Sequence, residues 1–385
     1  MADHYEIAVI GAGPAGSVAA RAAAESGKRV CLFERNSEPG TPVRCGEGIG
    51  YNGLHENVNV KPEWIKNTIK RTYMISPSGI KVQIDNVEES YILDRQKMDS
   101  DLAKEAVKSG VELFVSSPVE NLRRIDKNIY EISGPSKKVT ANCVIIADGV
   151  ESRLARLAGW DTSLKLKDVE TCAFARVVSP LIDKESCVFY TGTKVAPGGY
   201  AWIFPRSTGE ANVGLGILGP HSGPGKAKEL LQKFIDNELP GSKTSNLHCG
   251  GVPVARYIRP LVRDGVILAG DAARQVNSVS GAGIAYALFA GKAAGKTAAE
   301  AINGNSIDYN HLRMYEKRWK KRFGHQQDRS YSLKEFIVKT DDGFLDRIAS
   351  SLVKEDPKKM NYLRVFAKAF SGRPLLLLKA VKLFR

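Results

Sequence analysis

The stretch that decides the fold is EIAVIGAGPAG, residues 6–16. Its first five residues predict a buried strand, and the alanine-rich run from Pro14 to Ser26 predicts a helix that ends at Gly27. A second apolar run, residues 30–34, ends in Glu34. A strand, a Gly-x-Gly-x-x-Gly turn, a helix and a strand that ends in an acid together predict a βαβ unit with a dinucleotide site.

Each glycine of this motif has its own expected role. Gly11 allows the tight turn, Gly13 lets the backbone approach a pyrophosphate, and Gly16 lets the helix pack closely against the strand. The helix N-terminus offers free N–H groups and positive dipole to the phosphates. Glu34 can accept hydrogen bonds from the ribose hydroxyls and would repel a 2′-phosphate, which disfavours NADP. The alternative is a glycine turn that is only structural.

The chain contains a second copy of the glycine pattern, GLGILG at residues 214–219. The residues that follow, PHSGP, do not continue as a helix, so no helix N-terminus would face a phosphate there. We therefore reject this copy as a nucleotide site, although flavoenzymes that bind two nucleotides often carry two real copies.

A later stretch favours FAD over NAD. GDAA at 270–273 closes a buried strand, and GAGI at 281–284 opens a helix soon after. Asp271 can hydrogen-bond the ribityl chain of a flavin, and the glycines let a second helix N-terminus approach the pyrophosphate or the flavin. ADG at 147–149 adds another strand-end turn. A simple β–turn–α corner at 270–284 is the alternative.

The order of these patterns predicts an α/β fold with inserted segments. Strand and helix signals of the nucleotide-binding type alternate with β-rich stretches, and the pattern is helical after Tyr309. We predict a discontinuous Rossmann-like FAD-binding domain, an inserted antiparallel β-sheet substrate domain, and a helical, basic C-terminal region. The FAD-binding domain would comprise residues 1–67, 95–167 and 250–308. The substrate domain would comprise residues 68–94 and 168–249, and the C-terminal region residues 309–385.

Composition excludes several classes of protein. The six cysteines form no C-x-x-C pair, which argues against a zinc ribbon or an iron–sulfur cluster, and we expect no metal site. The N-terminus does not resemble a signal peptide, and no run approaches the roughly 20 apolar residues of a membrane-spanning helix. We therefore expect a cytoplasmic protein, free or attached to the inner face of the membrane.

Basic charge concentrates at the C-terminus. The net charge is +14, and the stretch from Pro357 onward interleaves Lys and Arg with Phe, Leu and Val and contains no acidic residue. This pattern is typical of a segment that lies on an anionic membrane surface. The alternative is a helix packed on the protein body. We expect no nucleic acid as a partner, because no known binding module is present.

The motifs, taken in order, resemble those of the geranylgeranyl reductases, flavoproteins of the para-hydroxybenzoate-hydroxylase type. PVRCGEG at 42–48 resembles their flavin loop, YILDR at 91–95 their segment with an FAD-contacting arginine, and YAWIFP at 200–205 their substrate-domain motif. The resemblance covers roughly residues 5–330. It implies FAD contacts at Ala15, Glu34, Cys45, Gly46, Gly48, Arg95, Val119, Asp271, Gly283 and Ile284.

One stretch departs from the family pattern. Members of the family usually have a proline between the Gly-Asp motif and the glycine pair, whereas this chain has QVNSVS at 275–280. The departure puts the shape of the loop beside the flavin in question, but not the binding of FAD.

The resemblance also implies a reaction. This is FAD-dependent reduction of isolated C=C bonds in geranylgeranyl chains of prenylated glycerophospholipids, with electrons from ferredoxin, NAD(P)H or another donor. Three alternatives stay open: an FAD monooxygenase of an aromatic or quinone substrate, a flavoprotein dehydrogenase that reduces a quinone, and a non-catalytic prenyl-binding escort protein. The intact glycine motif, Glu34 and Asp271 argue for bound flavin and against the escort protein.

An isolated alkene has no carbonyl to activate it, so the site must supply a proton as well as hydride and must exclude water. We hypothesise that Cys45, in its glycine-rich loop, lies near the flavin and either relays this proton or moves with the redox state of the flavin. The alternative is a small side chain that packs under the flavin ring. Glu47 is a second catalytic candidate, and a loop-solvating carboxylate is its alternative interpretation.

The substrate-domain motif predicts a lipid-binding surface. Tyr200, Trp202 and Phe204 alternate along a strand, so they share one face and could line an apolar tunnel. The alternative is ordinary sheet core. We interpret Gly214 and Gly216 as places where the substrate or the flavin comes close to the backbone.

Overall fold

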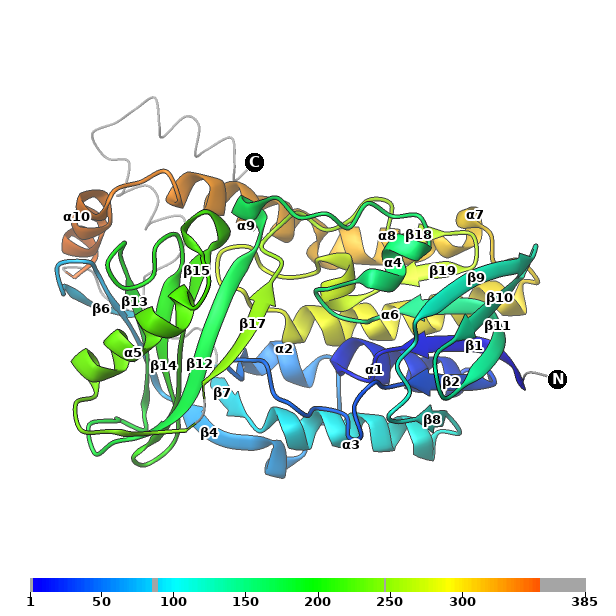
Figure 1. The fold of residues 1–385 in the computed structure, drawn as a ribbon, viewed down its shortest axis with the longest axis horizontal. Helices are drawn as coiled ribbons and strands as arrows, with labels where there is room; N and C mark the ends of the chain where they lie inside the picture. Colours follow the sequence, from blue (N-terminus) through cyan, green and yellow to red (C-terminus); the bar gives the residue numbers. More distant parts are fainter. Residues whose placement is uncertain (1–2, 85–88, 246, 354–385) are drawn as a thin grey trace.

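A computed structural model describes residues 3–84, 89–245 and 247–353 of the chain. The elements form two lobes that lie side by side along the long axis of the molecule (Figure 1). The parallel-sheet lobe is built on one eight-stranded sheet, and the antiparallel-sheet lobe is built on another. The predicted α/β fold, with a Rossmann-like part, a β-rich part and a helical C-terminal region, is confirmed.

The parallel-sheet lobe contains the βαβ unit that the opening motif predicts. Strand β1 pairs in parallel with both β2 and β11, so the carboxyl ends of these strands meet at one edge, where ligands bind in such folds. A hairpin of two strands, which the sequence analysis did not anticipate, extends β11. The strands are β18 (Val262–Arg263), β19 (Val266–Leu268), β11 (Lys138–Ile146), β1 (Asp3–Ile10), β2 (Val30–Phe33) and β8 (Glu112–Phe114), with the hairpin β9 (Asn121–Asp126) and β10 (Ile129–Ser133).

Two helices of this lobe cross at very short range. A Cβ on Gly291 of α6 (Ile284–Asn303) would lie 2.1 Å from the carbonyl oxygen of Ala15 in α1 (Pro14–Ala24). Gly295 has the same relation to Ala19, also at 2.1 Å. Glycine at both positions therefore lets the first turns of α1 pack directly on the middle of α6. The lobe also contains α2 (Tyr51–His55), α3 (Arg95–Lys108) and α4 (Arg153–Leu157).

The antiparallel-sheet lobe has one covered face and one face turned to a cavity. Helix α5 (Lys226–Glu238), not anticipated from the sequence, packs Leu231 and Phe234 with Ala173 and Ala175 in one hydrophobic cluster. Alternate residues of the strands face the other way. The strands, in sheet order, are β16 (Lys243–Thr244), β12 (Glu170–Val178), β15 (Glu210–Leu218), β14 (Tyr200–Ser207), β13 (Ser186–Thr191), β5 (Arg71–Ile75) and β6 (Lys81–Ile84), and β17 (His248–Val252) also pairs with β12.

The second glycine pattern lies inside this sheet. GLGILG begins in β15, which pairs on both sides with β12 and β14, and a short turn rather than a helix follows it. The prediction that this stretch does not run directly into an α-helix is confirmed.

A small third sheet joins the flavin-loop segment to neighbouring strands. It consists of β3 (Gly48–Gly50), β7 (Ser90–Leu93) and β4 (Ile65–Ile69). The predicted ranges place residues 90–93 in the substrate domain, whereas here they pair with β3 and β4. The predicted limit at 249 and 250 lies inside β17, which continues to Val252.

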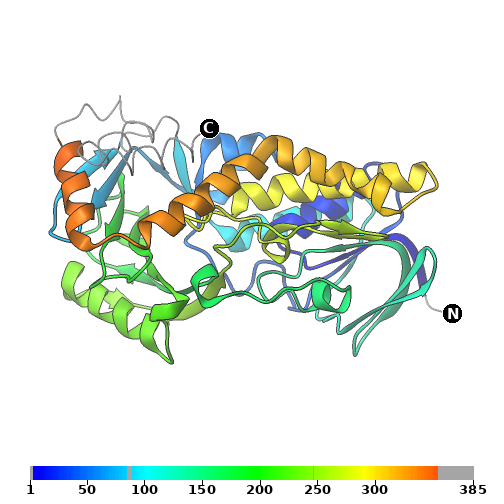
Figure 2. The same ribbon diagram turned by 90° about the horizontal axis from the view of Figure 1, so that it is seen from above.

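The chain then runs back along the molecule as helices, as the sequence predicts from Tyr309. Figure 2 shows this segment extending from the parallel-sheet lobe to the antiparallel-sheet lobe. Trp319 contacts Tyr286 of α6 edge to face and Phe323 contacts it with a tilted ring at one end, and Ala349 packs on Val82 of β6 at the other. The helices are α7 (Tyr309–Leu312), α8 (Met314–Trp319), a π-helical turn (Lys320–Gly324), α9 (His325–Ile337) and α10 (Asp342–Leu352).

The basic stretch from Pro357 onward lies outside the described residues. Within the described ranges, none of the helices has the length and apolar character needed to cross a membrane.

Candidate functional site

A cavity of about 630 Å³ is lined by both lobes. This volume lies in the range of roughly 300–1,000 Å³ that small-molecule sites occupy. The parallel-sheet lobe contributes the glycine motif and both strand-end turns, and the antiparallel sheet contributes a row of aromatic side chains. Among the lining residues are Gly13, Ala15, Cys45, Gly46, Glu47, Gly48, Arg95, Asp271, Gly283 and Ile284 on one side, and Glu170, Cys172, Phe189, Tyr200, Trp202, Phe204 and Gly216 on the other.

The three motif glycines differ in their surroundings as the sequence predicts. Gly11 has φ +98°, and a Cβ there would lie 2.3 Å from the carbonyl oxygen of Ala147. A Cβ on Gly16 would lie 1.8 Å from the carbonyl oxygen of Gly11. Gly13, the N-cap of α1, has nothing within 4 Å of its Cβ position. Two glycines therefore serve packing, and the third leaves open space at a helix N-terminus, where a pyrophosphate fits.

Glu34 is fixed at the end of β2. Its carboxylate accepts hydrogen bonds from the backbone N–H of Ala12 at 3.0 Å and of Asn36 at 2.9 Å. The side-chain Nδ2 of Asn36 donates a third hydrogen bond to it, at 2.9 Å. An ionised carboxylate has about four acceptor positions, so about one position remains for a ribose hydroxyl. Ser117, two residues before Val119, donates its N–H to the carbonyl of Glu34 at 2.9 Å. Glu34 and Val119 do not line the cavity, and this segment places Val119 on the Glu34 side of the site.

Asp271 follows β19 in the short turn Gly270–Ala273, and its carboxyl group faces the N-terminus of α6. A Cβ on Gly283 would lie 3.4 Å from Asp271 Oδ1, which leaves little room for a larger residue. Burial raises the pKa of Asp271 to about 6, and the Arg95 guanidinium partly offsets this effect. The two parts of the later motif, GDAA and GAGI, thus line the same cavity as the first glycine motif.

The loop that departs from the family pattern is held by hydrogen bonds. The side chain of Asn277 accepts from the N–H groups of Val279 at 3.0 Å and Ser280 at 3.2 Å. The hydroxyl of Ser278 donates to the carbonyl of Ala255 at 3.2 Å, and the Tyr200 hydroxyl donates to the carbonyl of Ser280. Side-chain hydrogen bonds therefore fix this loop where the family has a proline.

Cys45 lies at the junction of the two lobes. Its Sγ accepts a hydrogen bond from the Glu47 N–H at 3.2 Å, and its carbonyl accepts from Asn212 Nδ2 at 3.1 Å. Burial raises the pKa of the Cys45 thiol, although Arg95 opposes the shift. The thiol therefore keeps its proton near neutral pH. Arg95 itself forms two hydrogen bonds to Asp99, at 2.8 and 2.7 Å.

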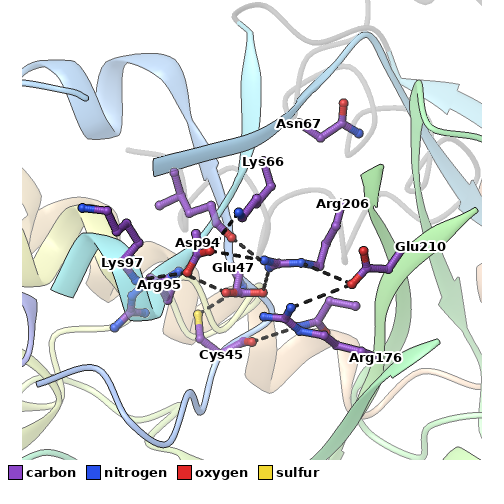
Figure 3. A network of polar contacts seen from close by, with 12 residues as sticks. Cys45, Glu47, Lys66, Asn67, Asp94, Arg95, Lys97, Arg176, Arg206 and Glu210 are labelled. Carbon is purple, nitrogen blue, oxygen red and sulfur yellow. Dashed lines mark hydrogen bonds and ion pairs between the residues drawn. The ribbon is translucent and has the colours of Figure 1, made fainter. Parts of the chain in front are cut away.

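Glu47 does not present a free carboxylate to the cavity. It is 1% exposed, pairs with Arg206 of β14, and accepts the Arg95 N–H at 3.1 Å (Figure 3). Arg206 is 3% exposed and also donates to the carbonyl of Leu93 at 3.0 Å. Because both carboxylate oxygens are engaged, this arrangement argues against Glu47 as a proton-transfer group. The sequence analysis missed Arg206, although it directly follows the aromatic motif.

The aromatic motif forms the wall of the cavity. Tyr200, Trp202 and Phe204 lie on one face of β14, with 5.9 Å between the ring centroids of successive residues. Phe189 of β13 extends the row, 5.2 Å from Phe204. A Cβ on Gly46 would lie 3.3 Å from Phe204, so the row touches the loop of Cys45. The predicted common face is present, and it lines a cavity rather than a closed core.

The two glycines of β15 differ from each other. A Cβ on Gly214 would lie 2.3 Å from the indole of Trp202, so this glycine makes room for a side chain. Gly214 does not line the cavity, and the expectation of direct ligand contact at this residue is corrected. Gly216 does line the cavity, and a Cβ there would lie 3.0 Å from the carboxylate of Glu170 and 3.2 Å from Cys172 Sγ. The sequence analysis missed Glu170 and Cys172.

Comparisons with known proteins agree with this geometry. Residues 5–187 match the model of the pyridine nucleotide-disulphide oxidoreductases, and residues 168–254 match that of the geranylgeranyl reductase catalytic domain. A digeranylgeranylglycerophospholipid reductase of Methanosarcina acetivorans is 40% identical over 100% of this chain and 97% of its own length. One from Methanoculleus marisnigri is 37% identical, with 99% of both chains covered.

Solved structures are also similar to this chain. A geranylgeranyl bacteriochlorophyll reductase-like protein of Thermoplasma acidophilum superimposes with a TM-score of 0.92 at 31% identity, with 99% of both chains covered. A flavin-dependent brominase superimposes with a TM-score of 0.71 at 17% identity over 99% of this chain and 93% of its own, and shares the fold alone.

The fold and the two-sided cavity define a flavin-dependent oxidoreductase. Full-length similarity then fixes the group more closely. The chain belongs to the geranylgeranyl reductase family.

Proposed function

We propose that this protein uses FAD to saturate isolated C=C bonds in the geranylgeranyl chains of digeranylgeranylglycerophospholipids, precursors of membrane ether lipids. The single observation that carries this proposal is the shared cavity. The nucleotide motifs line one side of it, and the aromatic row of the antiparallel sheet lines the other. Relatives that carry this reductase name align over the full chain.

The residues present fit FAD. Gly13 leaves open space at the N-terminus of α1 for a pyrophosphate, and Glu34, which accepts three hydrogen bonds, keeps about one acceptor position for a ribose hydroxyl. Asp271 would accept from the ribityl chain, and Gly283 and Ile284 would present the N-terminus of α6. Reduced FAD, when bound, supplies the hydride for the double bond.

The chain's own residues provide the remaining requirements. The aromatic row gives a wall without charge, which would hold a prenyl chain and exclude water. Cys45 lies where the loop beside the flavin meets this wall, and we keep it as a candidate contact of the flavin and the substrate. Glu47, held between Arg206 and the Arg95 N–H, would position that loop rather than transfer a proton.

Two partners belong to the same proposal. The net charge of +14 and the basic stretch from Pro357 suit an anionic membrane surface, where a lipid substrate with a phosphate would be reached from the cytoplasmic side. Electrons would come from a separate donor, which is ferredoxin, NAD(P)H or another reductant. This donor would not use the second glycine pattern, because that pattern lies in a strand of the sheet.

The test is a single turnover without oxygen. The purified holoenzyme is reduced with dithionite and mixed with digeranylgeranylglycerophosphate, and the flavin absorbance is followed. We expect the oxidised flavin spectrum to return with this lipid and not with its fully saturated counterpart. Reduced flavin that ignores the lipid but reacts with oxygen and hydroxylates an aromatic compound would support a monooxygenase. Protein without flavin that still binds the lipid would support an escort protein.

A further inference from the structure

Glu170 is a carboxyl group on the lipid side of the cavity that the proposed function has not yet used. It is the first residue of β12, is 5% exposed, and lines the cavity. Cys172 and Tyr200 both lie opposite Gly216 in the sheet register. The lack of a side chain at Gly216 makes room for the Glu170 carboxylate, whose Oε2 would lie 3.0 Å from a Cβ at that position.

Within the described residues, the Glu170 carboxylate has no hydrogen-bond donor. The positive charge of Lys334 on α9 interacts electrostatically with the Glu170 carboxylate. However, Lys334 Nζ donates its hydrogen bonds to other groups. Its hydrogen bonds go to the carbonyl of Lys167 at 2.8 Å, to Asp168 at 3.1 Å and to the carbonyl of Val254 at 3.1 Å. A buried carboxyl group without hydrogen-bond partners lowers the stability of the fold. Its position on a cavity wall therefore indicates a functional role.

The environment of Glu170 favours its protonated form. Burial raises its pKa to about 7, and Lys334 opposes this shift only in part. Two neighbouring titratable groups face it: Cys172 on the same strand and Tyr200 on β14, and burial raises the pKa of each. Neither would be charged near neutral pH. Glu170 therefore carries a proton for much of the time at neutral pH and can also release it.

Other acids in the cavity are less suited to donate a proton to a lipid. Glu47 is engaged by Arg206, and Asp271 faces the N-terminus of α6 on the nucleotide side. The thiol of Cys45, with its raised pKa, is a weaker acid than the Glu170 carboxyl. Of the carboxyl groups that line the cavity from the aromatic sheet, Glu170 is the one that the described structure leaves unpaired.

We propose that Glu170 is the acid that protonates the prenyl double bond, an inference that rests on the proposed function. The carboxyl O–H bond breaks, and its proton adds to the less substituted carbon with the π electron pair of the alkene. The more substituted carbon, now electron-poor, receives hydride with its electron pair from the reduced cofactor. The Glu170 carboxylate then regains a proton from solvent, so each turnover consumes one proton and one hydride.

The wild-type pH profile tests this assignment without any variant. In the anaerobic single turnover, the rate of lipid reduction should fall as the pH rises through about 7, because the proton donor is lost. A rate that rises through the same interval would overturn the proposal, since it would mean that the carboxylate, not the acid, assists the reaction.

Glu170→Gln keeps the shape and removes the proton. We expect it to slow lipid reduction by about 100-fold or more, the usual effect of losing a general acid, and to lose the fall in rate near neutral pH. Glu170→Asp should restore part of the rate. Glu229→Gln, at an exposed carboxylate on α5 paired with Lys233, is the matched control and should behave as wild type.

A second readout does not depend on turnover. The infrared difference between wild type and Glu170→Gln should contain the carbonyl band of a protonated carboxyl group that disappears as the pH rises through about 7. Absence of this band, or a Glu170→Gln enzyme as fast as wild type, overturns the proton-donor role alone. A wild-type holoenzyme that leaves the lipid unchanged overturns the proposed function and this role with it.

Discussion

Glu47 and Arg206 form a buried ion pair that ties the loop of Cys45 to the aromatic strand β14, across 159 residues of sequence. Each side chain is almost fully enclosed, and Figure 3 shows Asp94 and Glu210 near the same guanidinium. Asp94 and Glu210 each lie 3.9 Å from Arg206. The pair therefore fixes how the loop of Cys45 and the aromatic row of β14 meet.

Removal of one partner of this pair should strongly destabilise the protein. Glu47→Gln leaves Arg206 buried with a weaker partner, and such changes typically cost about 3–5 kcal/mol in the free energy of unfolding. Urea unfolding of the flavin-free protein measures this loss. The double variant Glu47→Leu with Arg206→Met, which removes both charges, should recover much of it. A single variant as stable as wild type would show that the pair does not join the lobes.

Gly13 and Gly16 should respond differently to alanine. Gly13→Ala adds a methyl group in open space, so the flavin-free protein should keep its melting temperature and lose FAD affinity. Gly16→Ala brings the methyl group to 1.8 Å from a carbonyl oxygen, so it should lower the melting temperature as well. Thermal unfolding and flavin titration separate the two effects. Equal behaviour of both variants would contradict the assigned roles.

Gly214→Ala should act on the lipid and not on the flavin. The new methyl group would lie 2.3 Å from the indole of Trp202, so the indole must move along the cavity wall. We expect weaker lipid binding and slower lipid reduction with unchanged FAD affinity. Adding Trp202→Phe, which shortens the clashing ring, should restore part of the rate. Loss of flavin from Gly214→Ala protein would instead indicate a general folding defect.

The contribution of Asp271 to the stability of the flavin-free protein should fall as the pH rises from about 4 to about 6. The pKa of Asp271 is raised from 3.8 to about 6 in the folded state, so the unfolded chain loses this proton first. The shift corresponds to a few kcal/mol at most, roughly 1.4 kcal/mol per pKa unit. Asp148, whose pKa is also raised to about 6, should contribute in the same direction.

Asp271→Asn isolates the first contribution. Between these pH values, the stability of this variant should fall less than that of the wild type. The decrease due to Asp148 should remain. Urea unfolding at several pH values measures the difference. An unchanged pH dependence in Asp271→Asn would show that the carboxyl group is not held in a desolvated position.

The features of this protein that the sequence predicts are those that depend on residues close together in the chain. The βαβ unit follows from apolar runs and glycine spacing, and the shared face of Tyr200, Trp202 and Phe204 follows from the period of a strand. These patterns lie within short windows of sequence. They were sufficient to predict the fold class and the family.

The remaining features depend on contacts between distant segments. Arg206 looks like a charge at a strand end, and only the fold brings Glu47 to it. A glycine at position 214 is consistent with a nearby ligand or with a nearby side chain. The position of the Trp202 indole in the folded protein shows that it is a side chain. Glu170 begins a strand, where an exposed charge is common, and its burial results from the cavity wall around it.

The central claim is the saturation of prenyl double bonds, and the mass of the lipid after one anaerobic turnover tests it most directly. Equal amounts of reduced holoenzyme and digeranylgeranylglycerophosphate are mixed without oxygen. The mass of the extracted lipid is measured by mass spectrometry and compared with the amount of flavin that was oxidised. We expect the lipid to gain two hydrogen atoms for each flavin oxidised. A lipid of unchanged mass beside oxidised flavin, or a lipid that gains oxygen once air is admitted, would contradict it.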